Sequence, residues 1–268
     1  MTTSLPKALS DRTMAALAGV ENLTRVAERE LTSPMSPGPV GELEVLRGER
    51  IAKVVRIALT VGQIGMDSHM IFAFTPADSA VPHFTLDSVM AGGRLAYHID
   101  LVQRADLACH LEYTDAVYQP LTPAFEEVRE RFGPSTAAIG PRQHAMMSPW
   151  MLVNRADEEH FTRIGAYLER YFEHWRGLVD KGLRAEVLAT LADTDLAARD
   201  ERSRANLFSP EVDPVWANVT RLLGDEQTEA LRGELLTNEL PANKVPANKV
   251  PANKVPANKV PANEVRGG

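Results

Sequence analysis

The segment SHMIFAFTPADSAVPHFTLDSVMAGGRLAYHIDLV, residues 68–102, contains three short runs that are rich in β-branched and aromatic residues. A proline-containing loop separates the first two runs, and Gly92–Gly93 separates the second from the third. Runs of this length between turn residues are typical of strands that neighbour one another in an antiparallel meander. The segment therefore predicts the centre of an antiparallel sheet.

The residues on either side of this segment extend the sheet and surround it with helices. The predicted strands are Glu42–Arg47, Ile51–Val61, Ser68–Phe74, His83–Val89 and Arg94–Leu101. Apolar spacing predicts a first helix from Ser10 or Asp11 to about Thr32, a loop over 33–41, and later helices over 121–131, 156–180, 183–199 and 214–237. Helices before and after one sheet predict a three-layer α/β/α sandwich, formed by residues 1–240 as one domain.

Residues 241–265 read PANKV four times and then PANEV. One proline in every five residues suits neither a helix nor a sheet, and one valine in five buries too little apolar surface to offset ordering. We therefore expect residues 241–268 to be a disordered or polyproline-like tail.

Charge and composition exclude several classes of protein. The chain has a net charge of −7, and residues 241–268 carry four Lys, one Arg and one Glu, so the remaining residues have a net charge of −11. An acidic domain is a poor binder of nucleic acid. There is no run of 18 apolar residues and no signal-peptide pattern, and Cys109 is the single cysteine. These features predict a cytoplasmic protein without a membrane partner.

The common cofactor motifs are missing from the sequence. It contains no G-x-G-x-x-G, no G-x-x-x-x-G-K-[ST] and no H-E-x-x-H, and Cys109–His110 stands alone. The sequence therefore gives no indication of a bound nucleotide or of a metal site.

Three segments together resemble the ferredoxin-dependent bilin reductases. The first is 68–102, where a His precedes a Pro-x-x-x-x-Asp strand, a glycine turn and a strand that ends in Asp-Leu; this chain has one extra residue between His69 and Pro82. The second is SPWMLVNRADEEHFTRIGAYLERYF, 148–172, and the third is EVDPVWANVTRLLGDEQTEALRGELL, 211–236. The family includes the red chlorophyll catabolite reductases, which the run 82–107 resembles about as well.

The resemblance implies an enzyme that reduces a linear tetrapyrrole without a bound cofactor, using electrons from a ferredoxin. It implies Asp87, His69 and Asp213 as catalytic residues. Candidates for substrate binding are His83, Thr85, Arg94, Ser148 and Arg155. One branch of the family, which performs a four-electron reduction, has a Glu twelve residues before the His, and that position is Ile57 here.

The chemistry requires acids close to the pigment. A carboxyl group donates a proton near pH 7 only where burial raises its pKa. Strand alternation places His83, Thr85 and Asp87 on one face of the sheet. We expect His69 to project to the same side as Asp87, and Asp213 to approach the pigment from the opposite side.

Other interpretations of the same residues remain open. Asp87 could be a sheet-rim residue, His69 a structural histidine and Asp213 a helix N-cap before Pro214. Alternative functions are an enzyme of this fold that acts on another conjugated metabolite, and a pigment carrier without activity. Because ferredoxins are acidic, a ferredoxin partner requires a basic cluster, for which the candidates are Arg129, Arg131 and Arg142.

Overall fold

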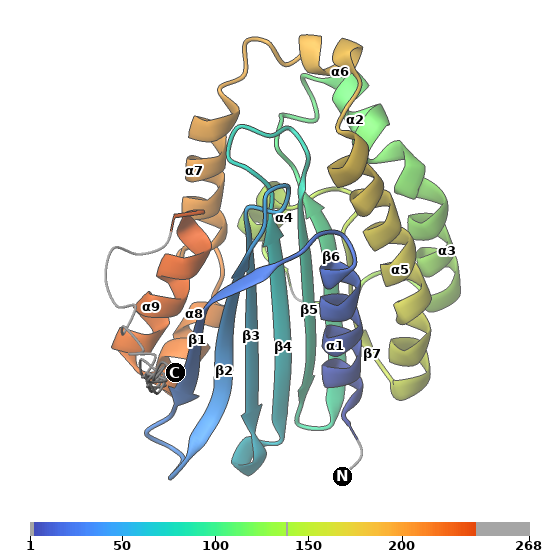
Figure 1. The fold of residues 1–268 in the computed structure, drawn as a ribbon. Helices are drawn as coiled ribbons and strands as arrows, with labels where there is room; N and C mark the ends of the chain where they lie inside the picture. Colours follow the sequence, from blue (N-terminus) through green and yellow to red (C-terminus); the bar gives the residue numbers. More distant parts are fainter. Residues whose placement is uncertain (1–2, 138, 240–268) are drawn as a thin grey trace, which may run out of the picture.

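Seven strands form one antiparallel sheet in which sequence order and spatial order coincide (Figure 1). The computed structural model describes residues 3–137 and 139–239, so the predicted tail, 241–268, lies outside the described residues. The strands are β1 (Thr24–Thr32), β2 (Pro39–Arg47), β3 (Lys53–Val61), β4 (Met66–Phe74), β5 (His83–Ala91), β6 (Arg94–Val102) and β7 (Leu152–Ala156). Short connections join β1 through β6 in turn, as the closely spaced strand runs predicted, whereas residues 103–151 separate β6 from β7.

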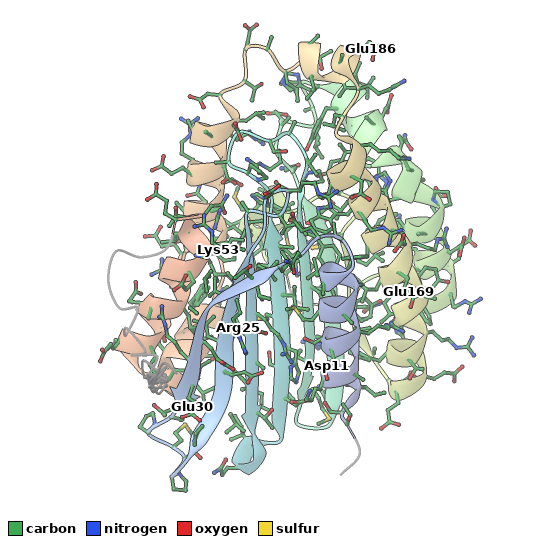
Figure 2. All side chains as sticks on the ribbon, viewed as in Figure 1. Asp11, Arg25, Glu30, Lys53, Glu169 and Glu186 are labelled. Atoms are coloured by element: carbon green, nitrogen blue, oxygen red, sulfur yellow. The ribbon has the colours of Figure 1, made fainter. Side chains whose placement is uncertain are left out.

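Helices cover both faces of the sheet (Figure 1). Those of the described residues are α1 (Leu5–Ala18), α2 (Leu111–Val117), α3 (Thr122–Phe132), α4 (Pro141–Met146), α5 (Glu158–Lys181), α6 (Ala185–Ala189), α7 (Leu196–Leu207), α8 (Val215–Leu223) and α9 (Asp225–Leu236). No helix among them is long and apolar enough to cross a membrane. Charged side chains such as Glu169 and Glu186 lie on their outer surfaces (Figure 2). The predicted α/β/α sandwich is confirmed.

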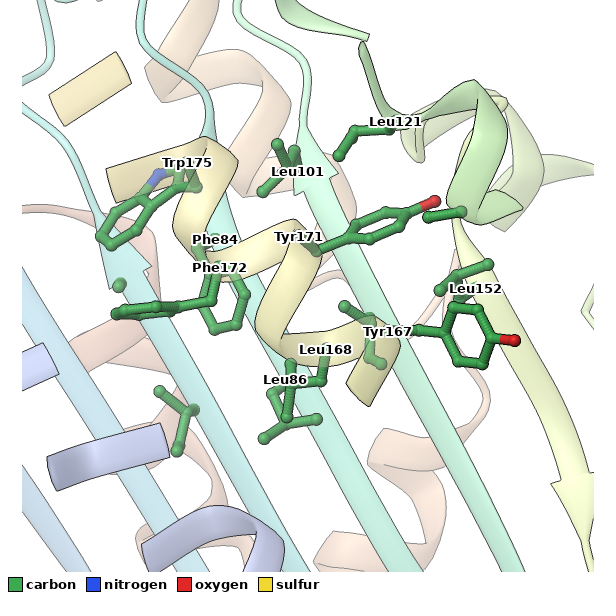
Figure 3. Close-up of a cluster of buried hydrophobic side chains, with 14 of the residues drawn as sticks. Phe84, Leu86, Leu101, Leu121, Leu152, Tyr167, Leu168, Tyr171, Phe172 and Trp175 are labelled. Carbon is green, nitrogen blue, oxygen red and sulfur yellow. The ribbon is translucent and has the colours of Figure 1, made fainter. Parts of the chain in front are cut away.

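One face of the sheet, which we call the α5 face, carries the larger core. Phe84 of β5 packs against Phe172 and Trp175 of α5 (Figure 3), with ring centroids 5.5 Å apart in both pairs. The indole of Trp175 donates a hydrogen bond to the Pro82 carbonyl, which satisfies its buried N–H. Helix α1 packs on the same face, against β4 and β5.

The opposite face, which we call the α8 face, packs against α7, α8 and α9. Two buried polar contacts hold these helices on the sheet. Lys53 of β3, labelled in Figure 2, donates to Glu234 of α9 at 2.8 Å. Asp200 of α7 accepts from His83 of β5 at 2.7 Å and lies 3.6 Å from the Arg104 guanidinium. Because each contact joins a strand to a helix, the two contacts hold α9 and α7 beside the sheet. The space between these helices and the sheet can then form a cavity.

The predicted first helix is wrong beyond Ala18. Helix α1 ends there, and residues 24–32 form β1 instead. Most β1 side chains are exposed, so the run lacks the apolar signal of a strand, and pairing with β2 decides its conformation. Strand β2 also begins at Pro39, within the predicted loop over 33–41.

Two predicted helices are each divided in the structure. The predicted helix 183–199 becomes α6 and α7, because Asp195 caps a new helix by accepting a hydrogen bond from the Ala198 N–H. The predicted helix 214–237 divides at Gly224, whose φ of 82° is left-handed and ends α8.

Candidate active site

A cavity of about 260 Å³ lies between the α8 face of the sheet and the helices α4, α7, α8 and α9. Its walls are mainly apolar and include Ile57, Met70, Phe72, Phe208, Trp216 and Leu231. Its titratable lining residues are Asp87, His98 and Asp213. A mainly apolar cavity with a few polar groups is the usual form of a small-molecule site.

Asp87 lies in the middle of β5, opposite Met70 on β4 and His98 on β6. Its Oδ1 is buried and has no hydrogen-bond partner among the described residues. Burial, followed by the charge of Asp213, raises the pKa of Asp87 to about 7. The carboxyl group is therefore partly protonated at neutral pH, and it can both give up a proton and accept one there.

Asp213 enters the cavity from the segment before α8. Its Oδ1 accepts a hydrogen bond from the Val215 N–H at 2.9 Å, so it also shapes the start of the helix. Burial raises the pKa of Asp213. The expectation that Asp87 and Asp213 line one cavity is confirmed.

His69 does not lie in this cavity, and the expected His69–Asp87 pair is wrong. Strand register pairs His69 with Ser88 and places Met70 opposite Asp87. The imidazole lies on the α5 face, with Nε2 3.0 Å from an oxygen of Asp67. An offset of one residue from the expected register places a side chain on the other face of a strand, which is the relation between His69 and Met70 here.

Two of the substrate-binding candidates have side chains committed to other contacts. His83 is buried outside the cavity; its Nδ1 accepts from the Thr75 N–H at 3.0 Å and its Nε2 is bonded to Asp200. Burial lowers the pKa of His83 to about 3. Ser148 is buried and donates to Asp100. For these two residues, the structure indicates a structural role in place of substrate binding.

The other three candidates lie on the cavity side of the sheet. Thr85 lines the cavity, and its hydroxyl lies 3.4 Å from the Asp100 carbonyl. Arg155 is exposed and follows the cavity-lining Val153 by two residues on β7, so it projects from the same face. Arg94 is exposed at the start of β6, four residues before His98 and on the same face.

His98 is a cavity residue that the sequence analysis missed. Burial lowers its pKa to about 4, so its imidazole is neutral at pH 7. The signal was present in the sequence, because a two-residue turn at Gly92–Gly93 pairs Ala91 with Arg94. Counting outward from that turn brings Asp87 opposite His98.

No family model and no curated protein matches the sequence. Among solved structures, the chain is similar to phytochromobilin synthase from tomato in complex with biliverdin. The TM-score is 0.69 at 15% sequence identity, and the match covers 87% of this chain and 85% of that chain. The likeness establishes the fold.

The arginines that were expected to form one basic cluster are dispersed. Arg129 stacks on Phe125, and Arg131 lines a separate surface hollow together with Glu127. Arg142 donates to the Glu211 carbonyl. The three side chains thus have different neighbours, and their role in binding a ferredoxin stays a prediction.

A different basic group lies beside the cavity. Arg199 and Arg202 of α7 line a hollow of about 380 Å³ with Gln103, Ser203 and Asn206. Among the described residues, neither guanidinium forms an ion pair. The hollow and the cavity share α4 and α7 as walls: Met146 lines the hollow, whereas Met147 lines the cavity.

Proposed function

We propose that this protein reduces a linear tetrapyrrole in the cavity, taking single electrons from a ferredoxin and protons from Asp87 and Asp213. The observation that carries the proposal is the apolar cavity that a carboxyl group with a pKa of about 7 lines together with a second, half-buried carboxyl group. The likeness to a biliverdin-bound phytochromobilin synthase supports it. Each reduction adds two electrons and two protons across one carbon–carbon double bond, and two molecules of ferredoxin are oxidised.

The two carboxyl groups come from different elements, Asp87 from the sheet and Asp213 from the segment before α8. A flat pigment between them would meet one acid on each side, which could set where the protons are added. Ile57 and Met70, which line the cavity, provide no further acid. We therefore propose a two-electron reduction.

The propionate groups of a tetrapyrrole need cationic partners, and the part of the cavity lining that the structure describes contains no Lys or Arg. At about 260 Å³, the cavity lies below the roughly 300–1,000 Å³ of typical ligand sites, so part of the pigment would extend out of it. We propose that the propionates point along the sheet toward the exposed Arg155 and Arg94, which can form bidentate ion pairs.

The experiment that tests this function is an anaerobic assay with biliverdin, reduced ferredoxin and the purified protein, followed by absorbance. We expect the biliverdin bands to be replaced by those of a reduced pigment in a reaction that needs both proteins. Spectral binding without turnover would favour a carrier. An unchanged spectrum at micromolar pigment would contradict the proposed substrate.

The basic hollow is our proposed contact for the electron donor, because an acidic ferredoxin is attracted to free guanidinium groups next to the pigment. We expect the double variant Arg199→Glu/Arg202→Glu to raise the KM for ferredoxin about tenfold or more at low salt, since charge reversal slows association. The Kd for biliverdin should not change.

Arg163→Glu/Arg170→Glu on α5 is the matched control, because it makes the same change of charge on the surface of another helix. An equal loss in both double variants would show only a general effect of net charge. An unchanged KM in the α7 variant would exclude the hollow as the contact.

A further inference from the structure

His98 and Asp87 form a pair of unsatisfied polar groups on neighbouring strands. They lie directly opposite each other in the β5–β6 register, so their side chains leave the same face of the sheet. Both line the cavity. His98 Nε2 and Asp87 Oδ1 are buried, and each lacks a hydrogen-bond partner among the described residues.

Two buried polar atoms without hydrogen-bond partners reduce the stability of the folded protein unless a bound molecule forms hydrogen bonds with them. A buried polar atom without a partner loses its hydrogen bond to water and gains nothing in return. The cavity lining is mainly apolar and includes Val102, Val153 and Phe72, so it offers few hydrogen-bond partners to the pair. Among the described residues three such atoms line the cavity, the third being the indole Nε1 of Trp216, and the two that face each other on neighbouring strands indicate a ligand edge that carries two matching polar groups.

The other buried histidines of the described chain do not meet these conditions. His83 has both ring nitrogens bonded, and His69 faces the other side of the sheet. His160 accepts or donates at the Tyr97 hydroxyl, and His174 donates to the Val117 carbonyl. His98 is thus the buried histidine whose free nitrogen lines the cavity.

The protonation states of the pair fit an uncharged ligand edge. The His98 imidazole is neutral at pH 7 because burial lowers its pKa to about 4. A neutral imidazole can donate from one nitrogen and accept at the other, and a carboxyl group can do either according to its protonation. A cyclic amide presents one N–H donor and one C=O acceptor side by side, which complements such a pair.

We infer that His98 and Asp87 together bind a lactam edge of the substrate, with Nε2–H of His98 donating to the carbonyl oxygen. His98 is thereby a substrate-binding residue that holds the substrate against the acid Asp87. The terminal rings of biliverdin-type pigments are lactams, so this inference rests on the proposed function and defines which end of the pigment enters the cavity.

The test compares His98→Phe and His98→Gln with the wild-type protein in anaerobic titrations with biliverdin. We expect His98→Phe to weaken binding about tenfold, the effect of losing one buried hydrogen bond, and to change the shape of the bound pigment's long-wavelength band. His98→Gln keeps an N–H donor and should recover most of the affinity. His69→Gln, a buried histidine on the other face, should leave both the affinity and the band unchanged.

A second measurement does not depend on how the variants fold. In wild-type protein labelled with ¹⁵N-histidine, biliverdin should shift the His98 Nε2 resonance as the hydrogen bond forms. If the wild type binds biliverdin but His98→Phe binds it equally well, or the resonance does not move, this inference fails alone. If the wild type leaves the pigment spectrum unchanged, the proposed function fails and the inference fails with it.

Discussion

Replacing Asp87 by Asn is expected to lower kcat for biliverdin reduction by about 100-fold or more, with little change in the Kd for biliverdin. A positioned general acid contributes typically 10²–10⁴-fold, and the amide of Asn cannot give up a proton. The amide keeps the size of the carboxyl group and can still hydrogen-bond to the pigment. Single-turnover absorbance measurements with reduced ferredoxin would give kcat, and anaerobic titration would give the Kd.

The proposed activity of the wild-type protein should also fall as the pH rises. Burial, and then the charge of Asp213, place the pKa of Asp87 at about 7, so the proton-donating form disappears as the pH rises through 7. The Asn variant should not show this loss in its residual rate. A wild-type rate that is constant between pH 6 and 8.5 would contradict the assignment of Asp87 as the acid.

We expect the lower activity of the Asp87→Asn variant to arise without a loss of folding stability. Between the ordinary pKa of 3.8 and the raised value of about 7, the folded state binds a proton at Asp87 more tightly than the unfolded state. Folding stability therefore falls as the pH rises through this window. Asn removes the penalty of burying a charge, so at pH 8 the variant should resist urea at least as well as the wild type. A lower urea midpoint for the variant at pH 8 would count against this account.

Replacing Asp200 by Ala is expected to reduce the free energy of unfolding by about 3–5 kcal/mol, the usual cost of breaking a buried ion pair by removing one partner. Asp200 is 5% exposed and lies within 3.6 Å of the guanidinium groups of Arg104 and Arg204. Without the carboxylate, two buried cations lose their counter-charge, and His83 loses its partner at 2.7 Å. Urea unfolding followed by circular dichroism would measure the loss.

Asp195→Ala is the matched control on the same helix. Asp195 is exposed and caps α7 by accepting from the Ala198 N–H, so its loss should cost about 1 kcal/mol. Equal losses of unfolding free energy in the two variants would show that Asp200 contributes no more to stability than an exposed capping residue of the same helix. A larger loss at Asp200 would also indicate a less firmly held cavity wall, because Leu207 at the end of α7 and Phe208 directly after it line the cavity.

The central sheet was predictable because its signals are local. Strand runs separated by Gly62–Gly65, Pro82 and Gly92–Gly93 indicate hairpins without any contact to more distant parts of the chain. The resemblance to a family singled out Asp87 and Asp213, which line one cavity, and their role as acids stays a prediction. Strand β1 was not, since its mostly exposed residues could equally form a helix until β2 provided a pairing edge.

Local residue patterns were enough to place a meander of strands between helical segments, with Asp87 in the middle of one strand. The histidine that stands opposite Asp87 is specified by the assembled sheet alone. The choice between His69 and His98 depends on strand register, and one residue of offset exchanges the two faces of a strand. Likewise, α8 and α9 had to pack on the sheet before Asp213 could meet Asp87, because a cavity exists only between elements that are distant in the chain.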